Sequence, residues 1–120
     1  MARFRLAGPA QADLANILAA SAERWGTEGR RRCAILLAAA MRIIAADPEG
    51  PLTHTRQELL PRLRFFICGM PAACSAGEGE KAGAVLYYRA LQPGLIEIVR
   101  VLRERTEPSR HFDTVAEDKT

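Results

Sequence analysis

The side chains of this sequence that could do chemistry are its arginines. The chain has 17 lysine and arginine residues against 14 aspartate and glutamate residues, and nearly all of the basic residues are arginine. A guanidinium group presents a planar fork of N–H donors that matches a carboxylate or a phosphate. The composition therefore suits an acidic protein partner or a nucleic acid, and the sign of the charge does not distinguish them. The candidate functional arginines are Arg64, Arg89, Arg100, Arg103, Arg105 and Arg110.

Metal and cofactor chemistry is not indicated by the spacing of the other polar residues. Cys68 and Cys74 lack the short paired spacing of a zinc knuckle, and His54 and His111 lie far from both and from each other. We therefore expect no metal site and no cofactor. His111 stays a candidate acid or base, because histidine ordinarily titrates near neutral pH.

Length and composition indicate one small domain. The chain has 120 residues, of which 48% are hydrophobic and 26% are charged, as in ordinary globular proteins. No apolar run reaches the roughly 18 residues of a spanning helix, and the N-terminus lacks the apolar segment of a secretory signal. We expect a cytoplasmic protein with no membrane contact: a domain over residues 1–112 and a disordered polar tail over 113–120.

Two helices are predicted in the first half of the chain. Apolar residues recur at three- and four-residue steps over residues 9–25, and a second apolar stripe runs from 33 to 44. Gly26-Thr27 separates the two helices, and the prolines of 47–51 end the second. Because about two residues join them, the helices should form an antiparallel hairpin, with Trp25 in the core at its end.

Strands are predicted on both sides of the helices: one precedes them and three follow them. Residues 3–6, 63–68, 84–89 and 95–101 have strand composition, and Gln92-Pro93-Gly94 is typical of a type II turn between the last two strands. Alternation places one of the two adjacent tyrosines in the core and exposes the other. In the last strand it places Ile96, Ile98 and Arg100 on one face and Leu95, Glu97, Val99 and Val101 on the other.

These elements predict an α+β fold with two layers. An N-terminal helical hairpin packed on a three- to four-stranded antiparallel sheet, in the order β-α-α-β-β-β, would bury every apolar stripe described above.

With its elements in this order, the chain resembles the ParE toxins of the ParE/RelE superfamily, which belong to bacterial type II toxin–antitoxin systems. The likeness spans nearly all of residues 3–112, except roughly 65–80. It is carried by the order and spacing of several short motifs. In the first half these are residues 14–25 with their Trp-Gly end and Asp47-Pro48. In the second half they are Arg62-Leu63-Arg64, the strand 85–89, and residues 96–111 with Arg103-Glu104-Arg105 and Pro108-Ser109-Arg110-His111.

The resemblance implies a plasmid-stabilisation type of toxin that is kept inactive by a cognate antitoxin. Such antitoxins usually have a ribbon-helix-helix DNA-binding domain and an acidic tail, so the toxin itself reads no DNA sequence. The best-known target of ParE toxins is DNA gyrase. The resemblance therefore implies that the chain inhibits an enzyme and is not itself an enzyme. The six candidate arginines would then form the face that binds the partner, because Arg–carboxylate pairs give steering and specificity.

The alternative within the superfamily is a RelE-like, ribosome-dependent mRNA endonuclease. Metal-free RNA cleavage needs a base, positive charge at the phosphate and an acid. Arg64, Arg89 and Arg103 could supply the charge, and His111 could act as acid or base. The RelE pattern uses lysines and a late tyrosine, whereas this region offers only Lys81 and no tyrosine follows Tyr88, so the nuclease is the weaker alternative.

Residues 66–75 depart from the family pattern, which often has a basic strand at this point. One permitted set of codons for 66–74, TTC ATC TGC GGC ATG CCC GCG GCC TGC, read from its third base encodes His-Leu-Arg-His-Ala-Arg-Gly-Leu, which does resemble the family. We therefore hypothesise a local frameshift that ends near Gly77 and leaves an inactive toxin able only to bind its antitoxin. The genomic codons test this. As written, the apolar run 65–68 either exposes an aggregation-prone edge or packs into the core.

Overall fold

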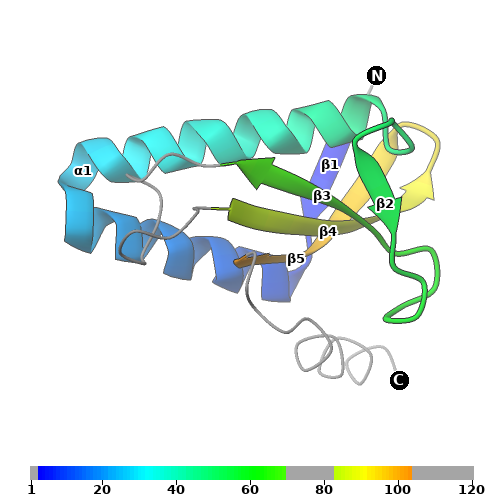
Figure 1. The fold of residues 1–120 in the computed structure, drawn as a ribbon, viewed down its shortest axis with the longest axis horizontal. Coiled ribbons are helices and arrows are strands. Elements are labelled where there is room, and N and C mark those ends of the chain that lie inside the picture. The colour runs from blue at the N-terminus through cyan, green and yellow to red at the C-terminus, as the bar shows by residue number, and fades with distance from the viewer. Residues whose placement is uncertain (1–2, 70–82, 104–120) are drawn as a thin grey trace.

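The computed structural model describes residues 3–69 and 83–103, in which one long helical segment covers a five-stranded sheet (Figure 1). The elements are β1 (Arg3–Leu6), α1 (Gly8–Ala46), β2 (Thr53–Thr55), β3 (Arg64–Gly69), β4 (Gly83–Gln92) and β5 (Leu95–Arg103). No helix among these residues combines the length and the apolar character needed to cross a membrane.

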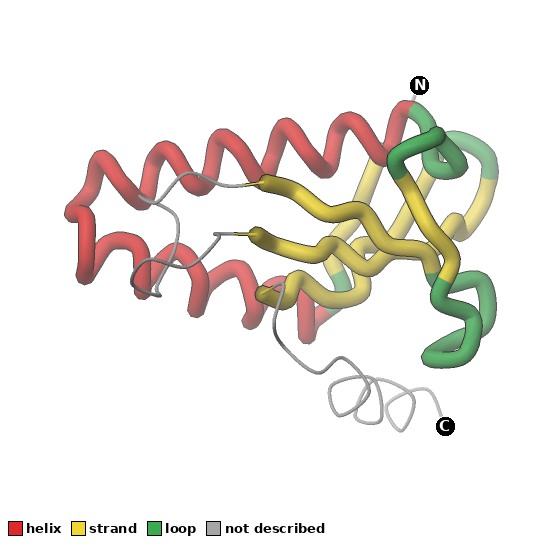
Figure 2. The backbone as a smooth tube through the Cα atoms, viewed as in Figure 1, coloured by secondary structure: helices red, strands yellow, loops and turns green. Residues whose placement is uncertain are grey.

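The helical segment α1 reverses direction at Gly26, so that its two arms run side by side (Figure 2). Gly26 has φ 73° and ψ −171°, a backbone conformation that is essentially restricted to glycine. The sequence predicted two helices with a short connection, whereas the structure has one segment that turns at a single residue. The turn lies beyond the ends of the described strands (Figure 2), and Trp25, the residue before Gly26, is 45% exposed. The prediction that Trp25 lies in the core was wrong.

The sheet has the strand order β1-β5-β4-β3-β2. Strands β2 to β5 pair antiparallel, but β1 lies parallel to β5, with Arg3 opposite Leu95. The prediction of a three- to four-stranded antiparallel sheet was therefore wrong in strand number and in direction. The pattern of alternation identifies a strand without its direction, and β2 is a polar strand of three residues that carries no apolar signal.

The main core lies between α1 and one face of the sheet. The apolar stripe predicted for residues 33–44 is confirmed as core-facing. The buried residues of this core are Ala10, Leu37, Ala40, Met41, Ile44 and Ala45 from α1, and Phe66, Ala84, Leu86, Tyr88, Ile96, Ile98 and Val101 from the sheet.

A second, smaller core lies on the opposite face of the sheet. The segment between β2 and β3 folds over this face and is closed at its base by a hydrogen bond from the Arg56 amide to the Leu63 carbonyl, 2.8 Å. Because this segment covers the face, Tyr87 is buried there while Tyr88 is buried on the α1 side, and the prediction that one tyrosine is exposed was wrong. The second core consists of Leu60, Leu63, Val85, Tyr87, Val99 and Leu102.

A β-bulge in β5 changes the predicted alternation. Tyr88 pairs with Ile98 and Tyr87 pairs with Arg100, which leaves Val99 as the extra residue. After the bulge, Val101 faces α1, although the alternation had placed it with Val99 on the other face. The single inserted residue shifts the period, and the apolar pattern contains no sign of it.

The described part of the unusual stretch 66–75 fits the fold. Phe66 is buried in the main core and Cys68 packs against it, as expected for an apolar run that packs inward. Ile67 faces outward and is 47% exposed. Residues 70–75 lie outside the described part of the chain.

Replacing Gly26 with alanine should destabilise the fold by about 1–3 kcal/mol, because alanine disfavours this conformation. A Cβ at this position meets no atom within 4 Å, so the cost is one of backbone conformation and not of crowding. Urea unfolding measures the loss. Gly8→Ala is the matched control, since its Cβ also meets nothing within 4 Å and its backbone is not left-handed. An equal effect of both substitutions would contradict the explanation.

Candidate functional site

The structure describes the side chains of three of the six candidate arginines, and it places them on different faces of the sheet. Arg64 lies opposite Tyr88 and therefore on the α1 side, whereas Arg89 lies opposite Glu97 on the other side. Arg103 ends β5, but its side chain lies outside the described residues, as do Arg105, Arg110 and His111. The described arginines therefore do not form one continuous surface.

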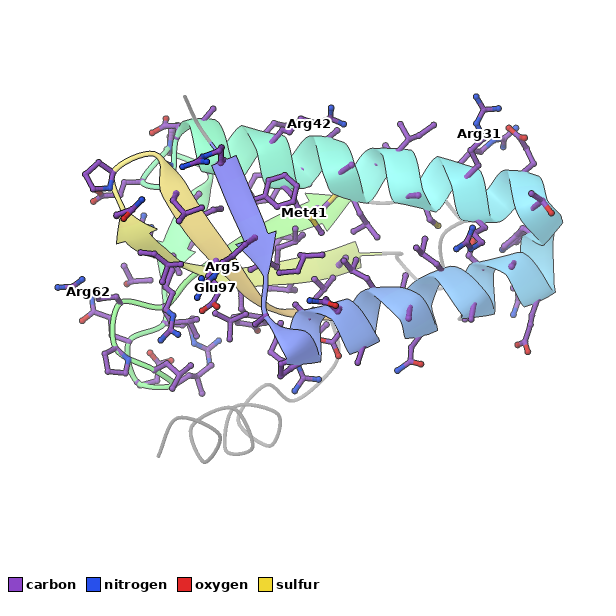
Figure 3. The ribbon with its side chains drawn as sticks, turned by 180° about the vertical axis from the view of Figure 1, so that it is seen from behind. Arg5, Arg31, Met41, Arg42, Arg62 and Glu97 are labelled. Carbon is purple, nitrogen blue, oxygen red and sulfur yellow. The ribbon has the colours of Figure 1, made fainter. Side chains whose placement is uncertain are left out.

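Arg89 is bound within the sheet by Glu97, which also binds Arg5. Two N–H groups of Arg89 donate to Glu97 Oε1 at 2.9 and 3.1 Å, and two of Arg5 donate to Glu97 Oε2 at 3.1 and 3.2 Å. The three residues form a row across β1, β5 and β4, in which Arg5 and Glu97 lie together in Figure 3. Glu97 is almost fully buried, and burial of a carboxylate requires such partners. The positive charge of Arg89 therefore compensates the Glu97 carboxylate within the sheet.

The sequence prediction did not single out Arg5, which shares the Glu97 carboxylate with Arg89. The two residues come together only because β1 lies parallel to β5 in this register, which the apolar pattern did not reveal.

Arg100 joins β5 to the first arm of α1. Its guanidinium group donates to both carboxylate oxygens of Asp13, at 2.6 and 2.7 Å, and Asp13 also accepts the amide of Val101 at 2.9 Å. The Arg100 and Asp13 side chains are only 12% and 11% exposed. Such a fork-to-fork pair fixes the helix on the sheet and leaves little of Arg100 for a partner.

Arg64 holds the chain that follows α1. Its Nε donates to the Pro48 carbonyl at 3.0 Å and its Nη2 to Thr53 Oγ1 at 2.7 Å, while the Tyr88 hydroxyl also donates to the Pro48 carbonyl. Burial raises the pKa of Tyr88, and the hydrogen bonds with Thr53 and Arg64 oppose this shift. Within residues 3–69 and 83–103, Arg64 forms no ion pair, so its charge is uncompensated by a carboxylate.

Beside Arg64 lies a cleft of about 650 Å³. The chain after α1 and the start of β3 form one wall, and the β4–β5 turn forms the other. The turn matches its prediction, with Gly94 at φ 80°. The residues that line the cleft are Pro48, Glu49, Thr55, Gln57, Arg62, Arg64, Ala90, Leu91, Gln92, Pro93, Gly94, Leu95 and Ile96.

Arg62 lines this cleft from a turn that glycine would form more easily. The Leu63 amide donates to the Leu60 carbonyl at 3.1 Å, with Pro61 and Arg62 at the middle positions. Arg62 has φ 63°, and among the described residues it is the one non-glycine residue with positive φ. The buried side chains of Leu60 and Leu63 and the fixed φ of Pro61 hold it there. Sequence reasoning missed Arg62 as a site residue, although a residue after Leu-Pro in a tight turn was a usable signal.

Above the ordinary pKa of a tyrosine phenol, the stability of the folded chain should decrease with pH because of Tyr88. The folded state binds the phenolic proton more tightly than the unfolded chain, whose ordinary value is 10.0. Stability from this group is therefore full below about pH 10 and is lost as pH rises through the raised folded pKa. Urea midpoints measured across this range should fall less steeply for Tyr88→Phe than for the wild type. Identical slopes would show that Tyr88 titrates as in the unfolded chain.

Arg62→Gly should stabilise the fold by about 1 kcal/mol, because relief of the left-handed strain exceeds the extra entropy of glycine in the unfolded chain. Arg62→Ala keeps the strain and should bring no such gain. Thermal or urea unfolding of both variants measures the difference. A less stable Arg62→Gly variant would mean that the arginine side chain itself supports the turn.

Comparison with known proteins finds a likeness among solved structures. No protein-family model matches the sequence, and no curated protein matches it. A chain in the solved structure of the chromosomal ParDE TA system from P. aeruginosa is similar, with a TM-score of 0.57 and 17% sequence identity. The likeness covers 86% of this chain and 96% of that chain. At this level of identity it shows that the two chains share a fold.

Proposed function

We propose that this chain is the toxin component of a bacterial type II toxin–antitoxin system. The observation that carries the proposal is the fold that it shares with a chain of the ParDE system over 86% of its length. The near-complete coverage of both chains supports a domain of the same extent, in agreement with the order of motifs in the sequence.

The partner in this proposal is a cognate antitoxin with a ribbon-helix-helix domain and an acidic tail, met in the cytoplasm. We assign its contacts to Arg64 and to the basic run of Arg103, Arg105 and Arg110. Arg89 and Arg100 are less suited to this role, because their guanidinium groups already bind Glu97 and Asp13. Breaking the Arg100 pair would leave the Asp13 carboxylate without a cation, and breaking the Arg89 pair would leave Oε1 of the buried Glu97 without its donors.

The target in this proposal is DNA gyrase, and the chain is an inhibitor without enzymatic activity. In the nuclease alternative Arg64, Arg89 and Arg103 could supply the positive charge at the phosphate, but Arg64 and Arg89 lie on opposite faces of the sheet. The separation of these two cations favours gyrase inhibition over RNA cleavage.

Induction of the chain in bacteria without an antitoxin, followed by pulse-labelling of DNA and protein synthesis, tests the function. DNA synthesis should stop first while translation continues, and purified protein should trap gyrase on DNA in vitro. Early arrest of translation would instead support the ribosome-dependent nuclease and direct attention to Arg103 and His111. Unchanged labelling with soluble protein present would identify an inactive copy, with the codons of residues 66–75 as the first place to look.

A further inference from the structure

The second arm of α1, which follows the turn at Gly26, carries positive charge on its surface and almost no negative charge. From residue 29 to the end of the helix at 46 the sequence contains no aspartate or glutamate, and the nearest carboxylates are those of Glu28 and Asp47. Glu28 lies 3.9 Å from Arg32 in an ion pair whose two side chains are both well exposed, so it cancels little of the charge. The cations of this arm are Arg30, Arg31, Arg32 and Arg42.

Arg31 and Arg42 lie along the same outer line of this arm. They are 11 positions apart, which is about three helical turns, so they leave the helix in nearly the same direction and roughly 16 Å apart along its axis. Both side chains point away from the sheet (Figure 3). Both are exposed, and neither forms an ion pair within residues 3–69 and 83–103. Arg42 donates its Nε–H to the Ala38 carbonyl at 3.3 Å, which leaves its terminal N–H groups for a ligand.

The surface between these two arginines is made of small and apolar side chains. Ala38 and Ala39 are half-buried, and Ile35 is 55% exposed. Alanine side chains keep the surface low, so a large ligand can approach the helix closely. The stretch from Arg31 to Arg42 contains no carboxylate that would repel an anion.

The end of the arm near β1 adds one more cation. A hollow of about 430 Å³ lies there, lined by Arg3, Phe4, Arg42 and Ala45. Arg3 is exposed and makes no ion pair among the residues that the structure describes. Arg3 therefore extends the positive surface of the arm past Arg42.

This arrangement fits double-stranded DNA better than a lipid surface. The major groove of B-DNA is about 12 Å wide and admits an α-helix, so two arginines roughly 16 Å apart on one helix can reach the phosphates on both sides of the groove. Binding to a lipid surface depends on a broad exposed apolar face. The apolar face of this arm is buried in the main core, and Ile35 and Ile43 are the large apolar side chains that it exposes among the described residues.

We propose that the outer surface of the second arm of α1 binds the backbone of double-stranded DNA without regard to sequence. Arg31 and Arg42 contact phosphates of the two strands across the major groove, and Arg3 and Arg30 add positive charge at the two ends of the arm. Contacts to phosphates position a protein on DNA and carry no sequence information. The inference is independent of the proposed toxin function, and its test contains neither an antitoxin nor gyrase.

The test is binding of the full chain to a short fluorescein-labelled DNA duplex, measured by fluorescence anisotropy at several salt concentrations. About two to four phosphate contacts predict that log K falls with log salt at a slope between about −2 and −4, and a duplex of different sequence should bind equally well. The absence of saturable binding at low salt overturns the proposal. Equal competition by polyglutamate at the same concentration of negative charge, or tighter binding to vesicles of anionic phospholipid, also overturns it.

Substitutions of arginine separate this surface from the net charge of the protein. Arg31→Ala and Arg42→Ala should each weaken binding about tenfold at about 0.1 M salt and make the salt slope shallower by about 1, because each removes one phosphate contact. Arg56→Ala is the matched control. It removes the same charge from the segment that covers the opposite face of the sheet, and it should leave binding unchanged. An equal loss in all three variants would mean that the attraction is non-specific.

A substitution between the two arginines tests the same surface without removing a cation. Ile35→Glu places a carboxylate against the DNA backbone, whereas Ile35→Gln has nearly the same size and no charge. Because Ile35 is exposed, both variants should have the same urea midpoint. The glutamate variant should bind the duplex about tenfold more weakly than the glutamine variant. Equal binding of the two variants would show that the DNA does not lie on this arm.

Discussion

The structure depends above all on the burial of β4 and β5 from both sides. The main core under α1 covers one face of these strands, and the segment between β2 and β3 covers the other. Strands in this position cannot keep an unpaired charge, because transfer of an ion out of water costs several kcal/mol. The pairs of Arg89 with Glu97 and of Arg100 with Asp13 follow from this constraint. Charged side chains of the sheet that are available to bind a partner therefore lie at its ends.

The same constraint explains which parts of the structure the sequence predicted. Local signals were sufficient for the apolar stripe at 33–44, for the β4–β5 hairpin and for its Pro93-Gly94 turn, because each depends on neighbouring residues. The direction of β1, the bulge at Val99 and the burial of Tyr87 depend on residues far apart in the chain, and a single sequence does not contain those pairings in readable form.

The candidate site was predicted only in part for a related reason. The sequence prediction selected arginines by type and position and so treated each one as an exposed cation. Among the described candidates, this description fits Arg64 best. Arg89 and Arg100 found carboxylates from other elements, and Arg62, which the sequence did not single out, is distinguished by its backbone and not by its chemistry. The chemistry of an arginine in this fold is thus decided by the strand or turn that carries it.

The parallel pairing of β1 with β5 also determines when the fold can form. Arg5 and Glu97 are 92 residues apart, so the chain must close a loop almost as long as the whole domain before this pair exists. Contacts between distant parts of a chain form late because their loop-closure entropy is lost first. On the ribosome, β1 and the first arm of α1 therefore emerge long before the strand that holds them. The finished sheet exists only after β5 has been translated, and until then β1 has no strand to pair with.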